Sequence, residues 1–474
     1  MKTSDAKAKI ICTIGPASER VETISRLIEK GMDVARLNFS HNSHENYKEI
    51  ISNIRKASLK VGREVAILQD LQGPKIRIGK VKSDAVHLQD GDVLEITTKE
   101  IEVGTEKIVS TNHKTIVNEA KVGSLVLLDD GYIILEVEKI KDDGLVTRII
   151  KGGVLKSNKG IVIPKSKSSA PSITEKDISD LKFGIENDID LVALSFVRSE
   201  KDVIELRAMM KIFGRILPII AKIERAESLE NIDKIINEAD GIMVARGDLG
   251  LEIEAEKVPI IQKEICRKCR YYGKPVIIAT QMLESMINNP RPTRAEASDV
   301  ANAVLDGADA LMLSGETSVG SFPVEAVDYM NRIILEAEKE EFSDHINKTG
   351  YYYNADIYDA IANASTIIAE QLKAKGIIAL TRSGFTAMAL SKYRPKIPIL
   401  ALTEYLETYR KLSFVWGVEP YRIPQKEAAY DTNEIVNLVK SKKIGKSGDK
   451  FVLASLTRVE FPNSENSIKI IEIR

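Results

Sequence analysis

The feature that most constrains the fold is a repeated unit, in which a short apolar, β-branched run ends in polar or small residues and a helical pattern follows. Eight such runs occur, at residues 9–15, 33–40, 65–69, 191–196, 216–224, 241–245, 275–279 and 310–314. Continuous apolar strands that alternate with helices form parallel sheets covered by helices. Eight of them predict a closed (β/α)8 TIM barrel, an architecture of the α/β class.

The repeat is interrupted once, because about a hundred residues separate the third run from the fourth. Within this gap the pattern changes to two-residue alternation with hairpin turns such as Asp90-Gly91. We predict an all-β lid domain over residues 74–170, inserted after the third strand. The flanking segments, 1–73 and 171–342, then total about 245 residues, close to the ~250 of a typical barrel.

A third domain is predicted after the barrel, over residues 343–474. A charged stretch ends near residue 354, and helical and strand patterns then alternate again. The strands are expected at residues 376–380, 399–402, 451–455 and 468–473. Alternation of this kind predicts an open α/β sheet.

The composition restricts where the chain acts and what it binds. Lys and Arg number 68 against 69 Asp and Glu, so the net charge of -1 argues against a mainly electrostatic grip on nucleic acid or on an anionic membrane. Three cysteines are too few to stabilise three domains by disulfides. Cys266 and Cys269 also lack a second pair of cysteines that would complete a zinc site. The first nine residues lack the apolar core of a signal peptide. We expect a cytoplasmic protein with neither a nucleic-acid nor a membrane partner.

The residues best suited to catalysis follow the fifth and sixth runs, because a barrel of this type has its reaction site at the carboxyl ends of its strands. Lys222 and Glu224 share one face of a strand by two-residue periodicity. After the sixth run, Gly247 permits a tight turn and the next helix offers free N–H groups to an anion, with Asp248 beside it. Glu224 and Asp248 are the usual minimum for holding Mg²⁺ or Mn²⁺, and Lys222 would face a phosphoryl group. A structural ion pair is the alternative for Lys222 and Glu224.

Other strand ends add polar groups to the same mouth. Thr280 ends the seventh strand with a hydroxyl, for which a simple helix cap is the alternative. Ser314 and Glu316 end the eighth strand, and Arg36 on the second supplies a fixed fork for phosphate. Hard oxygen ligands that resemble a monovalent-cation site come from Asn38, Ser40 and Asp70.

Seven longer stretches resemble the pyruvate kinase family. They are 34–41 (VARLNFSH), 73–77 (GPKIR), 220–224 (IAKIE), 240–254 (DGIMVARGDLGLEIE), 279–286 (ATQMLESM), 290–305 (PRPTRAEASDVANAVL) and 312–317 (MLSGET). That family has a barrel interrupted after its third strand by a β-rich lid and followed by an α/β regulatory domain. The resemblance implies transfer of the phosphoryl group of phosphoenolpyruvate to ADP in glycolysis, followed by protonation of the enolate to pyruvate.

The resemblance also implies roles for residues at matching positions. Glu224 and Asp248 would hold the divalent ion, and Lys222 would stabilise the phosphoryl group in flight and the developing enolate. The N–H groups of Gly247 and Asp248, with the Thr280 hydroxyl, would receive the substrate carboxylate. The phosphates would be steadied by Arg36 and Arg77, and the final proton would arrive through water near Thr280 and Ser314, in a network ordered by Glu316. Further nucleotide contacts would come from His41 and Lys159. His41 also lies three residues before His44, a spacing that invites a metal site, but no third ligand is evident nearby.

One departure from the family concerns the monovalent cation. Many members carry a glutamate where this chain has Lys75, and they need K⁺ held by the positions of Asn38, Ser40 and Asp70 along with a threonine where Leu71 stands. We hypothesise that the Lys75 ammonium takes the role of this ion, so that K⁺ is not required. A surface lysine on the lid hinge is the alternative.

The resemblance also suggests regulation and assembly. The matching loop of relatives binds a phosphorylated effector, and in this chain its residues are Thr381, Arg382, Ser383, Gly384 and Thr386. Hydroxyls, a glycine and free amides at a helix start form an anion pocket, although an ordinary helix cap uses the same residues. Family members assemble as tetramers, so we expect a homotetramer.

Two other functions remain open from the sequence. A metal-dependent lyase or aldolase would also hold Mg²⁺ with two carboxylates beside an anion-binding turn, but those barrels lack the inserted lid. A metabolite sensor without turnover would keep the fold and lose the reactive groups. Lys222, Glu224, Asp248 and Thr280 are all present, which argues against the sensor.

Overall fold

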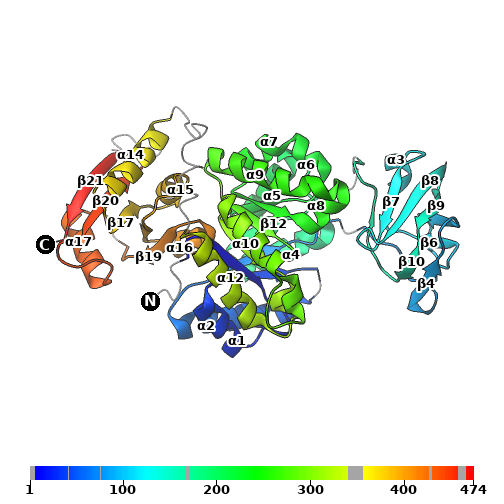
Figure 1. The fold of residues 1–474 in the computed structure, drawn as a ribbon, viewed down its shortest axis with the longest axis horizontal. Helices are drawn as coiled ribbons and strands as arrows, with labels where there is room; N and C mark the ends of the chain where they lie inside the picture. The colour runs from blue at the N-terminus through cyan, green and yellow to red at the C-terminus, as the bar shows by residue number, and fades with distance from the viewer. Residues whose placement is uncertain are drawn as a thin grey trace.

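The computed structural model describes residues 6–40, 42–74, 76–166, 171–339, 356–425, 430–456 and 466–473. It has three parts in a row, with the barrel between the β-rich lid and the C-terminal unit (Figure 1). The boundaries expected at residues 74, 171 and 343 stay predictions, and the last lies outside the described residues.

The central part is a closed barrel of eight parallel strands, which confirms the fold predicted from the repeated runs. In chain order the strands are β1 (Lys9–Thr13), β2 (Met32–Asn38), β3 (Ala66–Asp70), β12 (Leu191–Leu194), β13 (Ile219–Ile223), β14 (Gly241–Ala245), β15 (Val276–Ala279) and β16 (Ala310–Leu313). Their residues are buried except for half-buried Asn38, which explains why the runs are continuously apolar.

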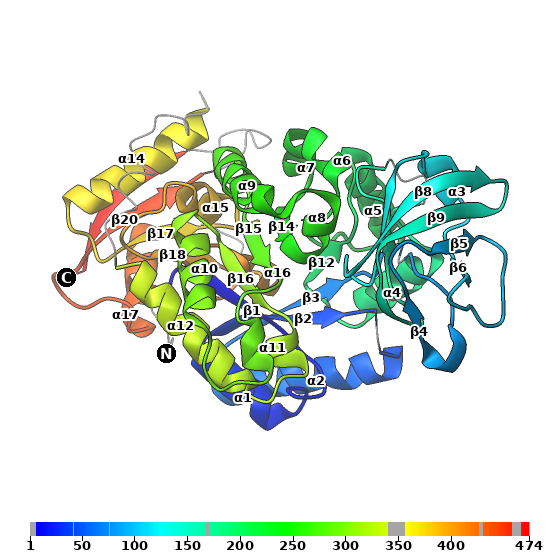
Figure 2. The same cartoon turned by 45° about the vertical axis from the view of Figure 1, so that its right-hand side comes forward.

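Helices surround the barrel strands (Figure 2). They are α1 (Val21–Lys30), α2 (His44–Val61), α4 (Glu175–Glu186), α5 (Glu200–Ile212), α6 (Ala226–Glu230), α7 (Ile232–Glu238), α8 (Arg246–Glu252), α9 (Val258–Tyr272), α10 (Arg294–Leu305), α11 (Gly315–Ser318) and α12 (Pro323–Ala337), with 3-10 turns η2 (Ala255–Lys257) and η3 (Glu284–Ile287). Capping boxes begin α4 at Thr174 and α10 at Thr293, because each hydroxyl and the acidic residue three positions later satisfy free N–H groups. Cys266 and Cys269 are buried on α9 without a disulfide.

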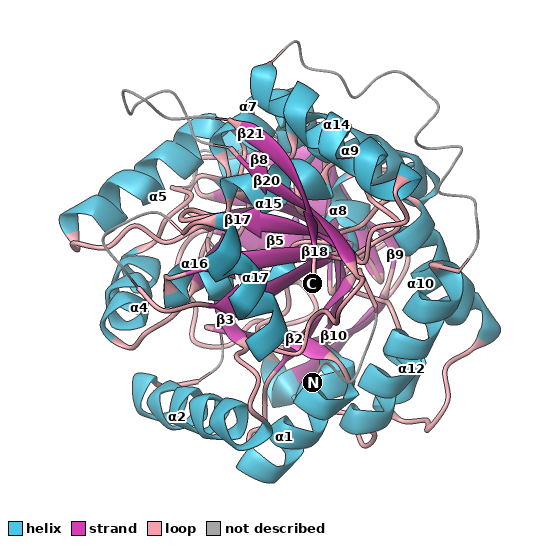
Figure 3. Cartoon of the chain, turned by 90° about the vertical axis from the view of Figure 1, so that its left-hand side faces the viewer, coloured by secondary structure: helices cyan, strands magenta, loops and turns pink. Residues whose placement is uncertain are grey.

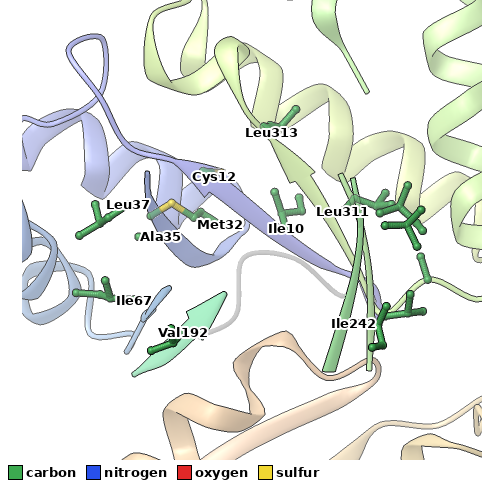
Figure 4. Packing of buried hydrophobic residues seen from close by; sticks show 14 of the residues in the cluster. Ile10, Cys12, Met32, Ala35, Leu37, Ile67, Val192, Ile242, Leu311 and Leu313 are labelled. Atoms are coloured by element: carbon green, nitrogen blue, oxygen red, sulfur yellow. The ribbon is translucent and has the colours of Figure 1, made fainter. Parts of the chain in front are cut away.

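The barrel has two layers of apolar core. Outward-facing strand residues such as Ile10, Ala35 and Leu311 pack against the helices (Figure 4). Inward-facing residues such as Ile11 and Met243 fill the interior. Two-residue alternation along each strand separates these layers, since neighbouring side chains point to opposite faces.

The lid follows β3 and is built mainly from strands, as the turn-rich insertion predicted, and these strands form two sheets. One sheet pairs β4 (Ala85–Leu88) with β10 (Gly153–Lys156). The other contains β11 (Ile161–Val162), β7 (Leu125–Leu128), β8 (Ile133–Lys141), β9 (Gly144–Lys151), β5 (Val93–Thr97) and β6 (Ile108–Ser110). Two short helical segments, η1 (Lys82–Asp84) and α3 (Ile116–Glu119), complete it. The lid has its own apolar core.

The C-terminal unit is an open five-stranded sheet, which Figure 3 shows in front of the barrel. Its strand order is β19 (Val418–Arg422), β18 (Ile399–Thr403), β17 (Gly376–Leu380), β20 (Lys450–Ser455) and β21 (Ser467–Glu472), the last antiparallel. One face packs against α14 (Ile357–Gln371) and α15 (Phe385–Ser391), and the other against α17 (Thr432–Ser441). A further helix, α16 (Leu406–Lys411), leads into η4 (Leu412–Phe414). The predicted α/β alternation is confirmed, although β19 and α17 were not expected.

The C-terminal unit closes the amino-terminal end of the barrel. Phe414 of η4 belongs to the interior barrel core, although it comes from another part of the chain. A Cβ atom on Gly241, at the start of β14, would lie 2.8 Å from Ile220 Cδ1 and 3.2 Å from the Phe414 ring, so the ring packs closely against this glycine. Arg394 also bonds both oxygens of Asp309 at 3.0 Å.

Across the described residues, the helices are too short or too polar to span a bilayer.

We predict that Phe414→Ala destabilises the protein, because it empties the floor of the barrel. Removing a buried phenylalanine ring costs about 3–5 kcal/mol of unfolding free energy. Leu59→Ala is the control, since Leu59 is 78% exposed on α2. Thermal unfolding should show a clear fall in midpoint for Phe414→Ala alone, and equal midpoints for the two variants would contradict this packing.

Candidate active site

A cavity of about 610 Å³ opens between the carboxyl ends of the barrel strands and the lid. The barrel contributes Glu224 and Asp248 to its walls, and the lid contributes Arg77 and Lys159. The two carboxylates at the strand ends and the two cations of the lid thus line the same cavity.

Lys222 is the centre of a buried polar cluster. Its Nζ lies 2.9 Å from Glu224 Oε1 and 3.2 Å from Asp70 Oδ1, and it donates to Ser195 Oγ at 2.7 Å. The residue is only 9% exposed. The shared face expected for Lys222 and Glu224 is therefore present, and the two groups are in direct contact.

Charges in this cluster determine which groups are ionised. Burial alone would raise the pKa of Asp70, but the charges of Lys222 and Arg36 outweigh it and hold that pKa below its ordinary value. Burial acts to lower the pKa of Lys222, yet Asp70 and Glu224 raise it above its ordinary value. Lys222 therefore stays a cation, and Asp70 stays an anion.

Arg36 is fixed by the same carboxylate. Its Nε donates to Asp70 Oδ2 at 2.7 Å, its Nη2 lies 2.7 Å from the same oxygen, and its Nη1 donates to Thr13 Oγ1 at 2.8 Å. These contacts hold the guanidinium rigidly at the end of β2, as a phosphate-binding arginine requires.

Glu224 and Asp248 have the donor chemistry of a divalent-cation site. Glu224 is 2% exposed, and its Oε2 accepts from the N–H of Phe196 at 2.7 Å. Burial raises the pKa of Glu224, the ammonium of Lys222 opposes that shift, and the negative charge of Asp248 adds to it. A divalent cation between the two carboxylates would relieve this repulsion. Within the described residues, no group of three or more His, Cys, Asp or Glu side chains could hold an ion. An ion held by Glu224 and Asp248 alone would complete its shell with water and substrate oxygens.

Thr280 adopts a strained backbone conformation at the end of β15. Its φ is +69°, and that of Gln281 is +56°. A non-glycine residue in this region costs about 1–3 kcal/mol, and a β-branched one is a marked outlier. The Thr280 hydroxyl accepts from the N–H of Gly247 at 2.8 Å and donates to the Ala279 carbonyl at 2.6 Å. The strained turn therefore brings this hydroxyl to the start of α8.

Glu316 connects two of the loops at the barrel mouth. It is 1% exposed, and its Oε1 accepts from the N–H of Leu283 at 3.0 Å. Its Oε2 accepts from the N–H of Ser314 at 2.7 Å. The carboxylate thus ties the loop after β15 to the loop after β16.

Three of the residues expected around a monovalent cation, Asn38, Ser40 and Asp70, lie near one another. Asn38 and Asp70 are register partners on β2 and β3, and Asn38 Oδ1 accepts from the N–H of Ser40 at 3.3 Å. Lys75 and His41 lie outside the described residues.

His44 is occupied elsewhere. It is the first residue of α2, and its Nε2 lies 2.7 Å from Asp180 Oδ1. Its ring stacks on Phe183 with centroids 4.4 Å apart. These contacts give the imidazole a structural role at the start of α2.

Both lid cations expected near the nucleotide line the cavity. Arg77 Nη1 donates to the Asn158 carbonyl at 3.2 Å, and Lys159 Nζ lies 2.7 Å from Asp129 Oδ1. The side-chain hydrogen bond to Asp129 raises the pKa of Lys159, so this residue also stays a cation.

The loop before α15 is partly used by the fold itself. Thr381 Oγ1 accepts from the N–H of Gly384 at 3.0 Å, and Thr386 Oγ1 donates to the Leu456 carbonyl at 3.3 Å. The exposed side chains of the loop are Arg382 and Ser383.

The sequence reasoning missed three groups that support the site. Ser195 bonds Lys222, Thr13 bonds Arg36, and the N–H of Phe196 bonds Glu224. Ser195 and Thr13 both lie at the ends of barrel strands, so the rule applied to the other strands would have found them. Phe196 acts through its backbone at a φ of +55°, for which its side chain gives no signal.

Comparisons with known proteins agree with this geometry. Residues 5–327 match the family model described as pyruvate kinase, barrel domain, and residues 359–471 match pyruvate kinase, alpha/beta domain. The pyruvate kinase of Geobacillus stearothermophilus is 46% identical over 469 residues, which cover 98% of this chain and 80% of that protein. That of Mycobacterium tuberculosis (strain CDC 1551 / Oshkosh) is 45% identical over 426 residues, or 89% of each protein.

A solved structure shows the same fold. The crystal structure of a pyruvate kinase from Cryptosporidium parvum superimposes with a TM-score of 0.93 at 38% sequence identity, covering 100% of this chain and 97% of the other. Family models, relatives and fold all agree, so the chain belongs to the pyruvate kinase family and is a phosphotransferase.

Proposed function

We propose that this chain transfers the phosphoryl group of phosphoenolpyruvate to ADP, giving pyruvate and ATP, with Mg²⁺ or Mn²⁺ as its divalent ion. The observation that carries the proposal is the contact of Lys222 with Glu224 beside the lid cavity, where a cation and a metal-binding carboxylate serve one phosphoryl group. The family membership supports the same substrates.

Lys222 and Arg36 are the cations that meet the phosphoryl group. Both are held by Asp70, so little reorganisation is needed when negative charge arrives on the phosphoryl oxygens. Lys222 also neutralises charge on the enolate oxygen as the phosphoryl group leaves. When bound by Glu224 and Asp248, a divalent cation would supply further charge neutralisation. Arg77 and Lys159 hold the nucleotide phosphates from the lid.

The substrate carboxylate would lie at the start of α8, where the Gly247 N–H meets the Thr280 hydroxyl and Asp248 follows in the chain. The Gly247 N–H now donates to the Thr280 hydroxyl, which donates to the Ala279 carbonyl, so both groups would exchange these bonds for the substrate carboxylate. They would then orient phosphoenolpyruvate so that its enol oxygen faces Lys222. Water near Thr280 and Ser314 delivers the proton to the enolate carbon, and Glu316 keeps the two loops in place.

The family's regulatory and assembly properties are also proposed for this chain. A phosphorylated effector would bind at the loop of Thr381, Arg382 and Ser383, and four chains would form a homotetramer in the cytoplasm. Light scattering measures the assembly, and a monomeric mass would exclude it.

Lys222→Met should abolish nearly all turnover, because it removes the cation that acts on the transition state. We expect kcat to fall by about 10²–10³-fold or more. Lys268→Met is the control, since Lys268 pairs with Asp233 at 2.6 Å on the outer helices and should stay near wild type. The assay is ADP-dependent release of pyruvate from phosphoenolpyruvate. Wild-type turnover that is the same without ADP would favour a lyase, and an active Lys222→Met would exclude the proposed role.

We further propose that K⁺ is not required. Leu71 stands where relatives carry an oxygen ligand, and its side chain is buried and purely apolar. The Asp70 carboxylate already contacts two protein cations, Arg36 and Lys222. Lys75 would supply the remaining positive charge.

Rates measured in sodium, tetramethylammonium and potassium chloride at equal ionic strength should agree within about twofold, because the protein provides its own cations. Activity that collapses without K⁺ and returns on its addition would contradict this proposal.

A further inference from the structure

The turn after β15 must be stabilised by neighbouring groups, because two consecutive non-glycine residues lie in the left-handed region of backbone conformation. Thr280 has a φ of +69° and Gln281 a φ of +56°. Left alone, such a turn relaxes toward negative φ, and the Thr280 hydroxyl would then leave the start of α8.

Arg246, the first residue of α8, binds this turn directly. Its Nη2 donates to the carbonyl of Thr280 at 2.8 Å and to the carbonyl of Gln281 at 3.1 Å, the two residues with positive φ. The same nitrogen lies 2.9 Å from the sulfur of Met282. The guanidinium thus binds the backbone of both strained residues.

Asp299 on α10 holds the other side of the guanidinium. Arg246 Nη1 lies 2.8 Å from Asp299 Oδ1 and 2.7 Å from Oδ2. The Arg246 side chain is 10% exposed and that of Asp299 is 38% exposed, so the guanidinium is shielded from water while the carboxylate stays partly solvated. A guanidinium can serve a carboxylate and two carbonyls at once because its donors form a planar fork.

The next residue in the chain contacts the same threonine. Gly247 donates its N–H to the Thr280 hydroxyl at 2.8 Å, so Arg246 and Gly247 together bind the carbonyl and the hydroxyl of one residue. Movement of the Arg246 contacts would therefore change where that hydroxyl points relative to the α8 amides.

We propose that Arg246 is a positioning residue, which holds the Thr280–Gln281 turn in its left-handed conformation and so places the Thr280 hydroxyl for the substrate carboxylate. The inference rests on the proposed role of Thr280 in binding phosphoenolpyruvate. Arg246 itself acts through the turn and does not need to touch the substrate.

Arg246→Lys tests this role with Arg394→Lys as a matched control. Arg394 is 9% exposed, pairs with both oxygens of Asp309 and donates to the Gly307 carbonyl at 2.8 Å, so it has the same bonding pattern away from the mouth. A lysine cannot reproduce the fork in either place. We expect Arg246→Lys to lower kcat/KM for phosphoenolpyruvate by about 10–100-fold with the KM for ADP nearly unchanged. Arg394→Lys should leave both constants within about twofold.

A double-mutant cycle with Thr280→Ala separates positioning from general damage. If Arg246 acts through Thr280, the double variant should be no slower than Thr280→Ala alone. Additive losses in the cycle, or equal losses in the two lysine variants, would overturn the proposal. Arg246→Gln takes the place of Arg246→Lys if the latter does not fold.

Hydrogen exchange of the substrate-free protein keeps this inference distinct from the proposed function. The peptide that covers residues 279–286 should exchange faster in Arg246→Lys than in Arg394→Lys, since its turn has lost its anchor. Equal exchange in the two variants would overturn the role of Arg246 whether or not the protein turns over substrate. A wild-type protein without ADP-dependent turnover would instead overturn the proposed function.

Discussion

The carboxylate of Asp70 is the interaction on which the site depends. It is 1% exposed and contacts two cations, Arg36 from β2 and Lys222 from β13. Unpaired, either cation would be costly to bury at the barrel mouth, and the pair would repel each other. The single carboxylate of Asp70 therefore stabilises two cations at a position where they can bind a phosphoryl group. The parallel barrel strands fix the positions of all three side chains, because the strands end at the same mouth.

Two of the strained backbone positions lie where the chemistry is proposed. Phe196 and Thr280 both have positive φ, and each contributes a group that the site uses. Phe196 presents its N–H to Glu224, and Thr280 presents its hydroxyl to the start of α8. A stable barrel can hold such unfavourable conformations because its apolar core supplies the stability that the strand ends give up.

Much of the architecture could be predicted because the barrel imposes a strong periodic pattern. Each continuous apolar run became a buried strand, and the polar residues that end β13 and β14 came together as expected. The features that could not be predicted depend on contacts between distant parts of the chain. Phe414 looks like any apolar residue of a helical segment, and nothing nearby in the sequence indicates that it fills the barrel floor. The strand β19 was missed because Pro420 interrupts its pattern, and β19 accommodates this proline because it lies at the edge of the sheet.

Glu224 and Asp248 are proposed to hold the divalent ion next to Lys222. Anomalous X-ray scattering from crystals grown with Mn²⁺ and phosphoenolpyruvate, but without ADP, tests it most directly. The account predicts one strong peak within about 2.0–2.3 Å of an oxygen of each carboxylate, with the substrate phosphate beside Lys222. Mn²⁺ bound away from either carboxylate, or a phosphate that does not face Lys222, would contradict it.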